Sequence, residues 1–152
     1  MNKDFLLVSD FNKADIIHLI RLAIAMKKSD FRSFMEEDEQ TNGFDDRDAW
    51  IDGYAEEPTY LDKGFLLALI FEKPSLRTRV SFEAAMQNLG GGSIFLSKDE
   101  IQIGKREEIK DVARTLSKMT DIIAIRTASH SNIEEFASFA TVPVINALSD
   151  LE

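Results

Sequence analysis

The chain has 152 residues, 44% of them hydrophobic, which is enough for one buried core and short for two domains of ordinary size. It has no cysteine and only two histidines, which excludes disulfides and thiolate metal sites and leaves no cluster of metal ligands. The formal net charge is −9, no basic stripe for nucleic acid is visible, and the longest apolar run, 65–71, is too short to cross a membrane, so we expect a cytoplasmic protein.

The N-terminal third is predicted to contain one helix and an acidic segment. Asn12 can cap a helix that ends near Lys28, because apolar residues recur at helical spacing at Ile16, Leu19, Ile20, Ala23 and Ile24. Residues 36–58 contain ten of the 27 acidic residues but only one of the 18 basic residues, so the rest of the chain is neutral. We interpret residues 36–60 as a solvated surface insertion, with a partner-binding or regulatory role as the alternative.

From residue 65 onward the sequence alternates strands and helices. Apolar runs predict buried strands at 65–71, 93–96, 121–126 and 142–146, and residues between them show the apolar spacing of helices. Residues 131–134 have the spacing of a capping box, which predicts that the last helix begins there. This order predicts an α/β fold with a single domain, a doubly wound parallel sheet of about four strands with helices on both faces.

The residues that follow these strands form a candidate anion site. Ligands of doubly wound sheets bind beyond the carboxyl ends of the strands. Residues 72–79 follow the first predicted strand, Arg126 and Thr127 end the third, and Asn146 ends the fourth. Two arginine-bearing strand ends at one edge of a neutral domain favour a small anion as the ligand.

Ser75 begins the helix after the first strand, and two interpretations of this helix end are open. Its free amides can bind a phosphate dianion together with the Arg77 guanidinium and the Thr78 hydroxyl. Alternatively, Ser75 only caps a helix with solvated arginines in its first turn. Arg79 stands four residues before Glu83, which predicts a structural ion pair, so we expect only Arg77 of the two arginines to reach a ligand.

Residues 71–83 read Phe-Glu-Lys-Pro-Ser-Leu-Arg-Thr-Arg-Val-Ser-Phe-Glu and resemble the Ser-x-Arg-Thr-Arg motif of the aspartate and ornithine transcarbamylases. Later blocks resemble the ornithine branch in order and spacing, at 89–91, 102–107, 111–114, 125–127 and 142–148. The resemblance extends from about residue 61 to the last residue.

The resemblance implies roles for individual residues. Carbamoyl phosphate would be bound by six of them, Ser75, Leu76, Arg77, Thr78, Gln102 and Arg126. Leu76 would act through its backbone N–H, and Gln102 would reach into the site of a neighbouring subunit, which implies a homotrimer. Arg126 would be the catalytic residue, because it would contact the carbamoyl oxygen on which charge develops. His130 lies at the same edge, where a loop role and a site role are both open.

The activity implied is that of the carbamoyl-phosphate-binding half of an ornithine carbamoyltransferase. Such an enzyme converts carbamoyl phosphate and L-ornithine to L-citrulline and phosphate, in arginine biosynthesis or in arginine and ornithine catabolism, without cofactor or metal. The family's His-Pro-x-Gln motif and its second, amino-acid-binding domain are absent from these 152 residues, so we expect the fragment alone to be inactive. Putrescine or aspartate as the acceptor stays open, as does a non-catalytic anion-binding or assembly module.

Overall fold

The computed structural model describes residues 4–28, 64–101 and 107–151. The acidic segment 36–60 and Gln102 lie outside these residues, so the predictions made for them stay predictions. The chain divides into two compact units, residues 11–59 and residues 1–10 together with 60–152, and each is described by itself. Within the described residues, no helix is long and apolar enough to cross a membrane.

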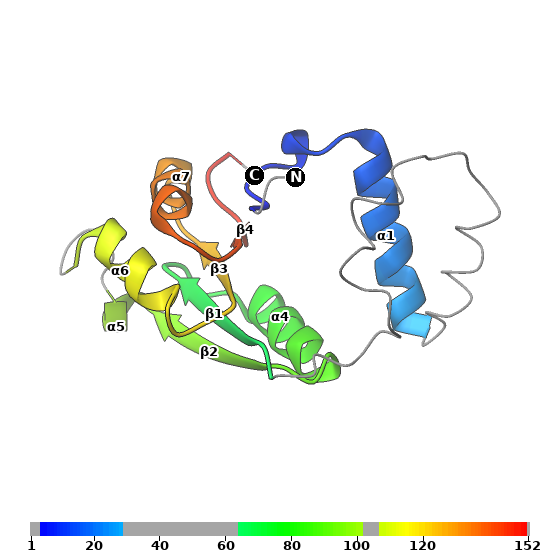
Figure 1. Ribbon diagram of the computed structural model, residues 1–152, viewed down its shortest axis with the longest axis horizontal. Helices are drawn as coiled ribbons and strands as arrows, with labels where there is room; N and C mark the ends of the chain where they lie inside the picture. The colour runs from blue at the N-terminus through cyan, green and yellow to red at the C-terminus, as the bar shows by residue number, and fades with distance from the viewer. Residues whose placement is uncertain (1–3, 29–63, 102–106, 152) are drawn as a thin grey trace. The chain divides into compact units, whose positions relative to one another are not determined.

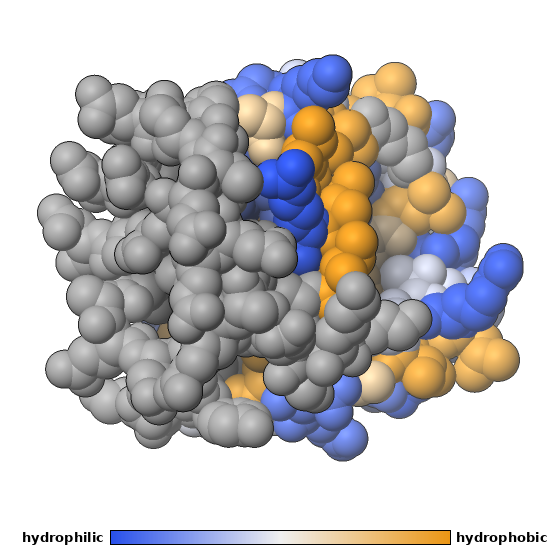
Figure 2. Space-filling view, turned by 90° about the vertical axis from the view of Figure 1, so that its right-hand side faces the viewer, coloured by the Kyte–Doolittle hydropathy of each residue, from blue (hydrophilic) through white to orange (hydrophobic). Residues whose placement is uncertain are grey.

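Helix α1, Lys13–Lys28, is the described helix of the first unit. Asn12 caps it as predicted, because its side-chain oxygen accepts the backbone N–H groups of Ala14 at 2.8 Å and Asp15 at 3.0 Å. The Asp15 carboxylate accepts the N–H of Asn12 at 3.1 Å, which completes a capping box. A band of hydrophobic residues runs beside hydrophilic ones in the space-filling view (Figure 2), and α1 exposes large apolar side chains at Ile17, Leu19, Ile20 and Ile24.

The second unit is built on a four-stranded sheet in which every strand pair is parallel. The strand order is β2-β1-β3-β4, with β1 at Leu66–Phe71, β2 at Gly92–Ser97, β3 at Ile122–Arg126 and β4 at Val144–Asn146. The helices of this unit are η1 (Val8–Asp10), α4 (Leu76–Asn88), α5 (Lys98–Ile101), α6 (Ile109–Leu116) and α7 (His130–Phe139). This arrangement confirms the predicted α/β fold with a parallel four-stranded sheet.

Strand β1 is covered on both faces, which explains its continuous apolar run. Ala68 and Ile70 belong to a core cluster with residues of α6 and α7, including Phe136. Leu67 and Leu69 belong to a second cluster that contains Met86 of α4. Figure 1 shows α4 on one side of the sheet and α6 and α7 on the other. The alternation of side chains along β1 therefore distributes its residues between two cores.

Helix α4 ends in a Schellman motif. The N–H of Gly90 donates to the carbonyl of Gln87 at 3.0 Å, the N–H of Gly91 donates to that of Met86 at 2.8 Å, and Gly90 has a φ of 80°. We expect Gly90→Ala to lower the free energy of unfolding by about 1 kcal/mol, because a Cβ disfavours this conformation. Urea denaturation followed by circular dichroism measures the change.

Gly64→Ala is the matched control, because a Cβ at Gly64 would have no heavy atom within 4 Å and Gly64 has no positive φ. Its unfolding midpoint should be at or above the wild-type value, because alanine restricts the unfolded chain. Equal effects of the two substitutions would contradict the role given to the conformation of Gly90.

Helix α7 begins at His130, two positions away from the start that the capping box predicted, and the prediction was therefore wrong. The N-cap is Ser129, which makes no side-chain capping hydrogen bond. The Asp150 carboxylate accepts the backbone N–H of His130 at 2.7 Å. A cap supplied by a residue 20 positions away replaces the local one, and Glu134 is left to face the His130 ring.

Strand β4 begins at Val144 rather than at residue 142, and it gains a neighbour from the N-terminus. Phe5 forms a parallel bridge with Ile145. The N–H of Phe5 donates to the carbonyl of Val144, and the carbonyl of Phe5 accepts the N–H of Asn146, both at 2.8 Å. The Asp4 carboxylate accepts the N–H of Val144 at 2.8 Å. A single bridge of this kind has no periodic pattern in the sequence that would predict it.

Candidate anion-binding site

The site lies at the carboxyl ends of β1 and β3, where the chain order of the sheet reverses. The chain passes from β1 to β2 on one side and then to β3 on the other, so the crossovers that follow β1 and β3 leave in opposite directions. Phe71 is paired with Arg126 in the register of the two strands, and the N–H of Glu72 donates to the carbonyl of Arg126 at 2.8 Å. Ligands of open α/β sheets bind at such a switch point.

The Arg126 guanidinium connects the end of β3 to the start of α4. Its Nη1 donates to the Ser75 hydroxyl at 3.2 Å and to the Thr78 hydroxyl at 3.3 Å. Three of the residues predicted for the site, 48 to 51 positions apart along the chain, are therefore in direct contact. Both distances are at the long end of the range for hydrogen bonds. The two contacts therefore hold the guanidinium in place but leave it able to donate further hydrogen bonds.

The start of α4 has backbone donors that no side chain of the helix occupies. Ser75 has the extended conformation of an N-cap, with φ −155° and ψ 105°, but it makes no capping hydrogen bond. The first intrahelical bond is from the N–H of Arg79 to the carbonyl of Ser75, so the amides of Leu76, Arg77 and Thr78 have no intrahelical acceptor. Because the Ser75 hydroxyl accepts from Arg126 instead, the simple capping interpretation of Ser75 does not hold.

The two arginines in the first turn of α4 differ in their surroundings. Arg79 forms the predicted ion pair, with Nε 2.9 Å from the Glu83 carboxylate, and its Cζ lies 3.8 Å from the centroid of the Phe95 ring. Arg77 is exposed, and its side chain has no partner within the described part of the chain. The first turn contains no acidic residue. A free cation at the positive end of a helix dipole favours an anionic ligand at this position.

Leu76 has the most exposed side chain of the described large apolar residues, at 79%. It is the first residue of α4, so its amide lies at the helix end. This position agrees with a role for the backbone N–H and gives the side chain no part in the cluster.

Arg126 has one buried donor without a partner. Its Nε is inaccessible to solvent and makes no hydrogen bond. A buried N–H that is left unpaired costs free energy and requires an explanation. An anion that accepts hydrogen bonds from the guanidinium would supply this explanation, because two donor edges of the guanidinium are still available after the contacts of Nη1.

Glu72 belongs to the site and was given no role by the sequence. Its carboxylate accepts a short hydrogen bond from the Thr127 hydroxyl and a second one from the N–H of Ala128 at 3.2 Å. Through its own N–H and its carboxylate, Glu72 thus holds Arg126 and the two residues that follow it. The available signal was a lone carboxylate directly after a strand, in a loop with Lys73 and the arginines.

Asn146, the candidate at the end of β4, is not part of this cluster. Its amide nitrogen donates to the carbonyl of Leu6 at 3.0 Å and to the Ser149 hydroxyl at 3.2 Å, and its oxygen accepts the N–H of Leu148 at 2.9 Å. Asn146 therefore organises the loop that follows β4.

Two exposed carboxylates flank residues 102–106. The N–H of Ser97 donates to Glu100 at 2.6 Å and lowers the pKa of that carboxyl. The Lys110 ammonium lies 2.5 Å from Glu108, lowers the pKa of Glu108 and has its own pKa raised in return. Both carboxylates are therefore ionised at neutral pH.

Comparisons with known proteins agree with this fold. Residues 3–152 match the family described as aspartate/ornithine carbamoyltransferase, carbamoyl-P binding domain. The chain is 43% identical over 148 residues to an ornithine carbamoyltransferase of Helicobacter hepaticus and 45% identical over 148 residues to one of Anoxybacillus flavithermus. These matches cover 97% of this chain and 38% and 40% of the relatives, so the chain spans less than half of their length.

Solved structures give the same result. The anabolic ornithine carbamoyltransferase of Campylobacter jejuni has a TM-score of 0.74 and 36% identity over 96% of this chain and 39% of its own. The catalytic subunit of the aspartate transcarbamoylase of M. jannaschii has a TM-score of 0.69 and 28% identity over 96% of this chain and 40% of its own. The resemblance based on residues 71–83 is thus confirmed, and the chain belongs to the aspartate/ornithine carbamoyltransferase family, of which it matches the carbamoyl-phosphate-binding domain.

Proposed function

We propose that this chain is the carbamoyl-phosphate-binding part of an ornithine carbamoyltransferase, which forms L-citrulline and phosphate from carbamoyl phosphate and L-ornithine. The observation that carries the proposal is the contact of Arg126 with Ser75 and Thr78 at the open start of α4. A guanidinium, two hydroxyls and the free amides of a helix end together provide donors on several sides of one phosphate. The relatives that share 43% and 45% of its residues are named ornithine carbamoyltransferases.

In this proposal the protein acts through position and charge. The amides of Leu76, Arg77 and Thr78 and the Arg77 guanidinium bind the phosphate. Arg126 donates to the phosphate and to the carbamoyl oxygen, which becomes more negative when an amine attacks the carbonyl carbon. A donor that binds more strongly as this charge develops stabilises the transition state more than the ground state. No cofactor or metal enters the reaction, because the phosphate is already a good leaving group.

The complete enzyme would need more than this chain. We propose a cytoplasmic homotrimer in arginine metabolism, with Gln102 of one subunit completing the site of the next and the 36–60 segment on the surface. The chain by itself is proposed to be a single domain that binds carbamoyl phosphate without forming citrulline. A citrulline assay with ornithine, run on the chain alone, tests the second statement, and any turnover would contradict it.

Aspartate is the acceptor of the second candidate function. The likeness to an aspartate transcarbamoylase at 28% identity favours it over other amines, and the donor site would be the same. Assays of the full-length enzyme with ornithine, aspartate and putrescine distinguish the acceptors. A preference for aspartate would overturn the ornithine assignment and leave carbamoyl phosphate binding intact.

Arg77→Ala tests the proposed donor site. We expect calorimetric titration with carbamoyl phosphate to show affinity weakened by about tenfold, as for the loss of one charge-assisted hydrogen bond. The thermal midpoint should not change, because the side chain is exposed and unpaired in the described part of the chain. Unchanged affinity would remove Arg77 from the site.

Lys118→Ala is the matched control for the loss of one positive charge. Lys118 is exposed and precedes β3, at the amino end of the sheet. Its substitution should leave the affinity at the wild-type value, since charges beyond about 10 Å are screened at physiological salt.

A further inference from the structure

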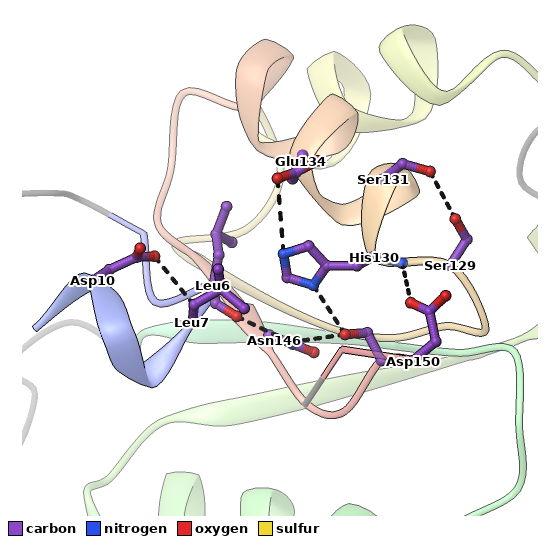
Figure 3. A network of polar contacts seen from close by, with 10 residues as sticks. Leu6, Leu7, Asp10, Ser129, His130, Ser131, Glu134, Asn146 and Asp150 are labelled. Carbon is purple, nitrogen blue, oxygen red and sulfur yellow. Dashed lines mark hydrogen bonds and ion pairs between the residues drawn. The ribbon is translucent and has the colours of Figure 1, made fainter.

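A buried histidine lies at the centre of a polar network beside the proposed site. His130 is 3% exposed, and its Nδ1 lies 2.9 Å from the Ser149 hydroxyl. Its backbone N–H donates to the Asp150 carboxylate at 2.7 Å. Figure 3 shows the ring between Glu134 of α7 and the loop after β4, with Asn146 reaching the same hydroxyl. His130 thus binds two consecutive residues of that loop.

The contacts of the two ring nitrogens favour one tautomer of His130. The Ser149 hydroxyl has one hydrogen and accepts from the amide nitrogen of Asn146. If it donates its hydrogen to Nδ1 of His130, the ring N–H is at Nε2 and faces the Glu134 carboxylate at 3.9 Å. This tautomer places a donor opposite a carboxylate, whereas the other would place a lone pair there. We therefore expect the tautomer with the ring proton on Nε2.

The loop that His130 holds is strained and contacts the backbone of the residues next to Arg126. Leu148 has a φ of 123°, which is unfavourable for a branched side chain, so the surrounding contacts must impose this conformation. The carbonyl of Leu148 accepts the N–H of Thr127 at 3.3 Å, and the N–H of Ala147 donates to the carbonyl of Ile125 at 2.8 Å. The loop therefore binds the backbone on both sides of Arg126.

We infer that His130 is a positioning residue for Arg126. It acts in three steps: the ring and the α7 amide hold Ser149 and Asp150, these hold Leu148 in its strained conformation, and Leu148 holds Thr127. Thr127 is also held by Glu72, whose carboxylate accepts a hydrogen bond from the Thr127 hydroxyl. The turn at Thr127 is thus held by hydrogen bonds from two loops. The inference that this affects anion affinity rests on the proposed function.

Ser149→Ala and Ser131→Ala form a matched pair for the test. Both remove a hydroxyl near the start of α7, but only Ser149 contacts the ring, while Ser131 is exposed and contacts Ser129. In Ser149→Ala we expect amide hydrogen exchange of Thr127 to become faster and affinity for carbamoyl phosphate to weaken by about fivefold. Exchange at Ile123 and Ile125 of β3 should not change, which separates a local effect from a loss of overall stability.

His130 is tested by replacement with asparagine and with alanine. Asparagine can place a polar atom where Nδ1 lies, so His130→Asn should keep both the slow exchange of Thr127 and most of the affinity, and His130→Ala should lose both. Nitrogen-15 spectra of the wild-type ring should show the N–H at Nε2. If His130→Ala fails to fold, Ser149→Ala and His130→Asn still test whether His130 positions Arg126.

The outcomes separate the inference from the proposed function. Unchanged Thr127 exchange in Ser149→Ala would overturn the inference, whether or not carbamoyl phosphate binds. Faster exchange with unchanged affinity would also overturn it, since Arg126 would then not depend on the loop. A wild-type protein that fails to bind carbamoyl phosphate would instead overturn the proposed function, and Thr127 exchange would still decide whether the loop holds the turn.

Discussion

Arg126→Met is expected to abolish measurable binding of carbamoyl phosphate, with affinity reduced by at least about 100-fold. Arg126 is the described side chain that contacts both hydroxyls of the proposed site, and a buried hydrogen-bonded charge contributes about 2–5 kcal/mol to binding when its partner is an ion. Calorimetric titration with carbamoyl phosphate measures the loss. Binding within tenfold of wild type would remove Arg126 from the site.

The same substitution should not destabilise the fold. The Nε of Arg126 is buried without a partner, and the distances from Nη1 to the two hydroxyls are at the long limit of hydrogen bonding. Replacing such a group by an apolar side chain of similar length is neutral or stabilising, by up to about 1 kcal/mol. A residue that binds the ligand and lowers the free energy of unfolding is typical of a functional site.

Arg114→Met is the matched control. Arg114 is an arginine of α6 whose Cζ lies 5.2 Å from the centroid of the Phe139 ring, and among the described residues it makes no hydrogen bond with Ser75 or Thr78. The Arg114→Met variant should bind carbamoyl phosphate with the affinity of the wild type. Loss of affinity in both variants would indicate a general effect of net charge.

The contact of Arg126 with Ser75 and Thr78 could be predicted from the sequence because the fold itself brings these residues together. Once the strands at 65–71 and 121–126 were predicted to be parallel, residues that follow them had to share one edge of the sheet. Arg126, Ser75 and Thr78 meet there, 48 to 51 positions apart in sequence. The Arg79–Glu83 pair was predictable for a different reason, since residues four apart are neighbours on any helix.

Contacts between loops could not be predicted in this way. Asp150 caps α7 from 20 positions away, and the capping box at 131–134 offered a local signal that proved wrong. Glu72 accepts from Thr127 across 55 positions, although both lie in loops that strand prediction placed at the same edge. Periodicity describes which face of an element is buried, but a hydrogen bond between two loops depends on conformations that have no period.

The Glu72 carboxylate gives a test in which two physical effects have opposite signs. It lies at the edge of a proposed anion site, so removing its charge should strengthen anion binding if only electrostatics mattered. It also accepts from the Thr127 hydroxyl and the N–H of Ala128, next to Arg126, so removing the acceptor should weaken binding by loosening the turn. Glu72→Gln removes the charge and keeps an acceptor, whereas Glu72→Ala removes both.

We therefore expect Glu72→Gln to bind carbamoyl phosphate as tightly as the wild type or more tightly, and Glu72→Ala to bind it at least about tenfold more weakly and to lose about 1–3 kcal/mol of unfolding free energy. The stability loss follows because Thr127 is 4% exposed and its hydroxyl would lose its acceptor. Adding Thr127→Val to Glu72→Ala should then cost little more, and the coupling should reach about 0.5–3 kcal/mol. Additive effects, or weaker binding by Glu72→Gln and Glu72→Ala alike, would contradict the role given to the Glu72 carboxylate as the acceptor that holds the turn beside Arg126.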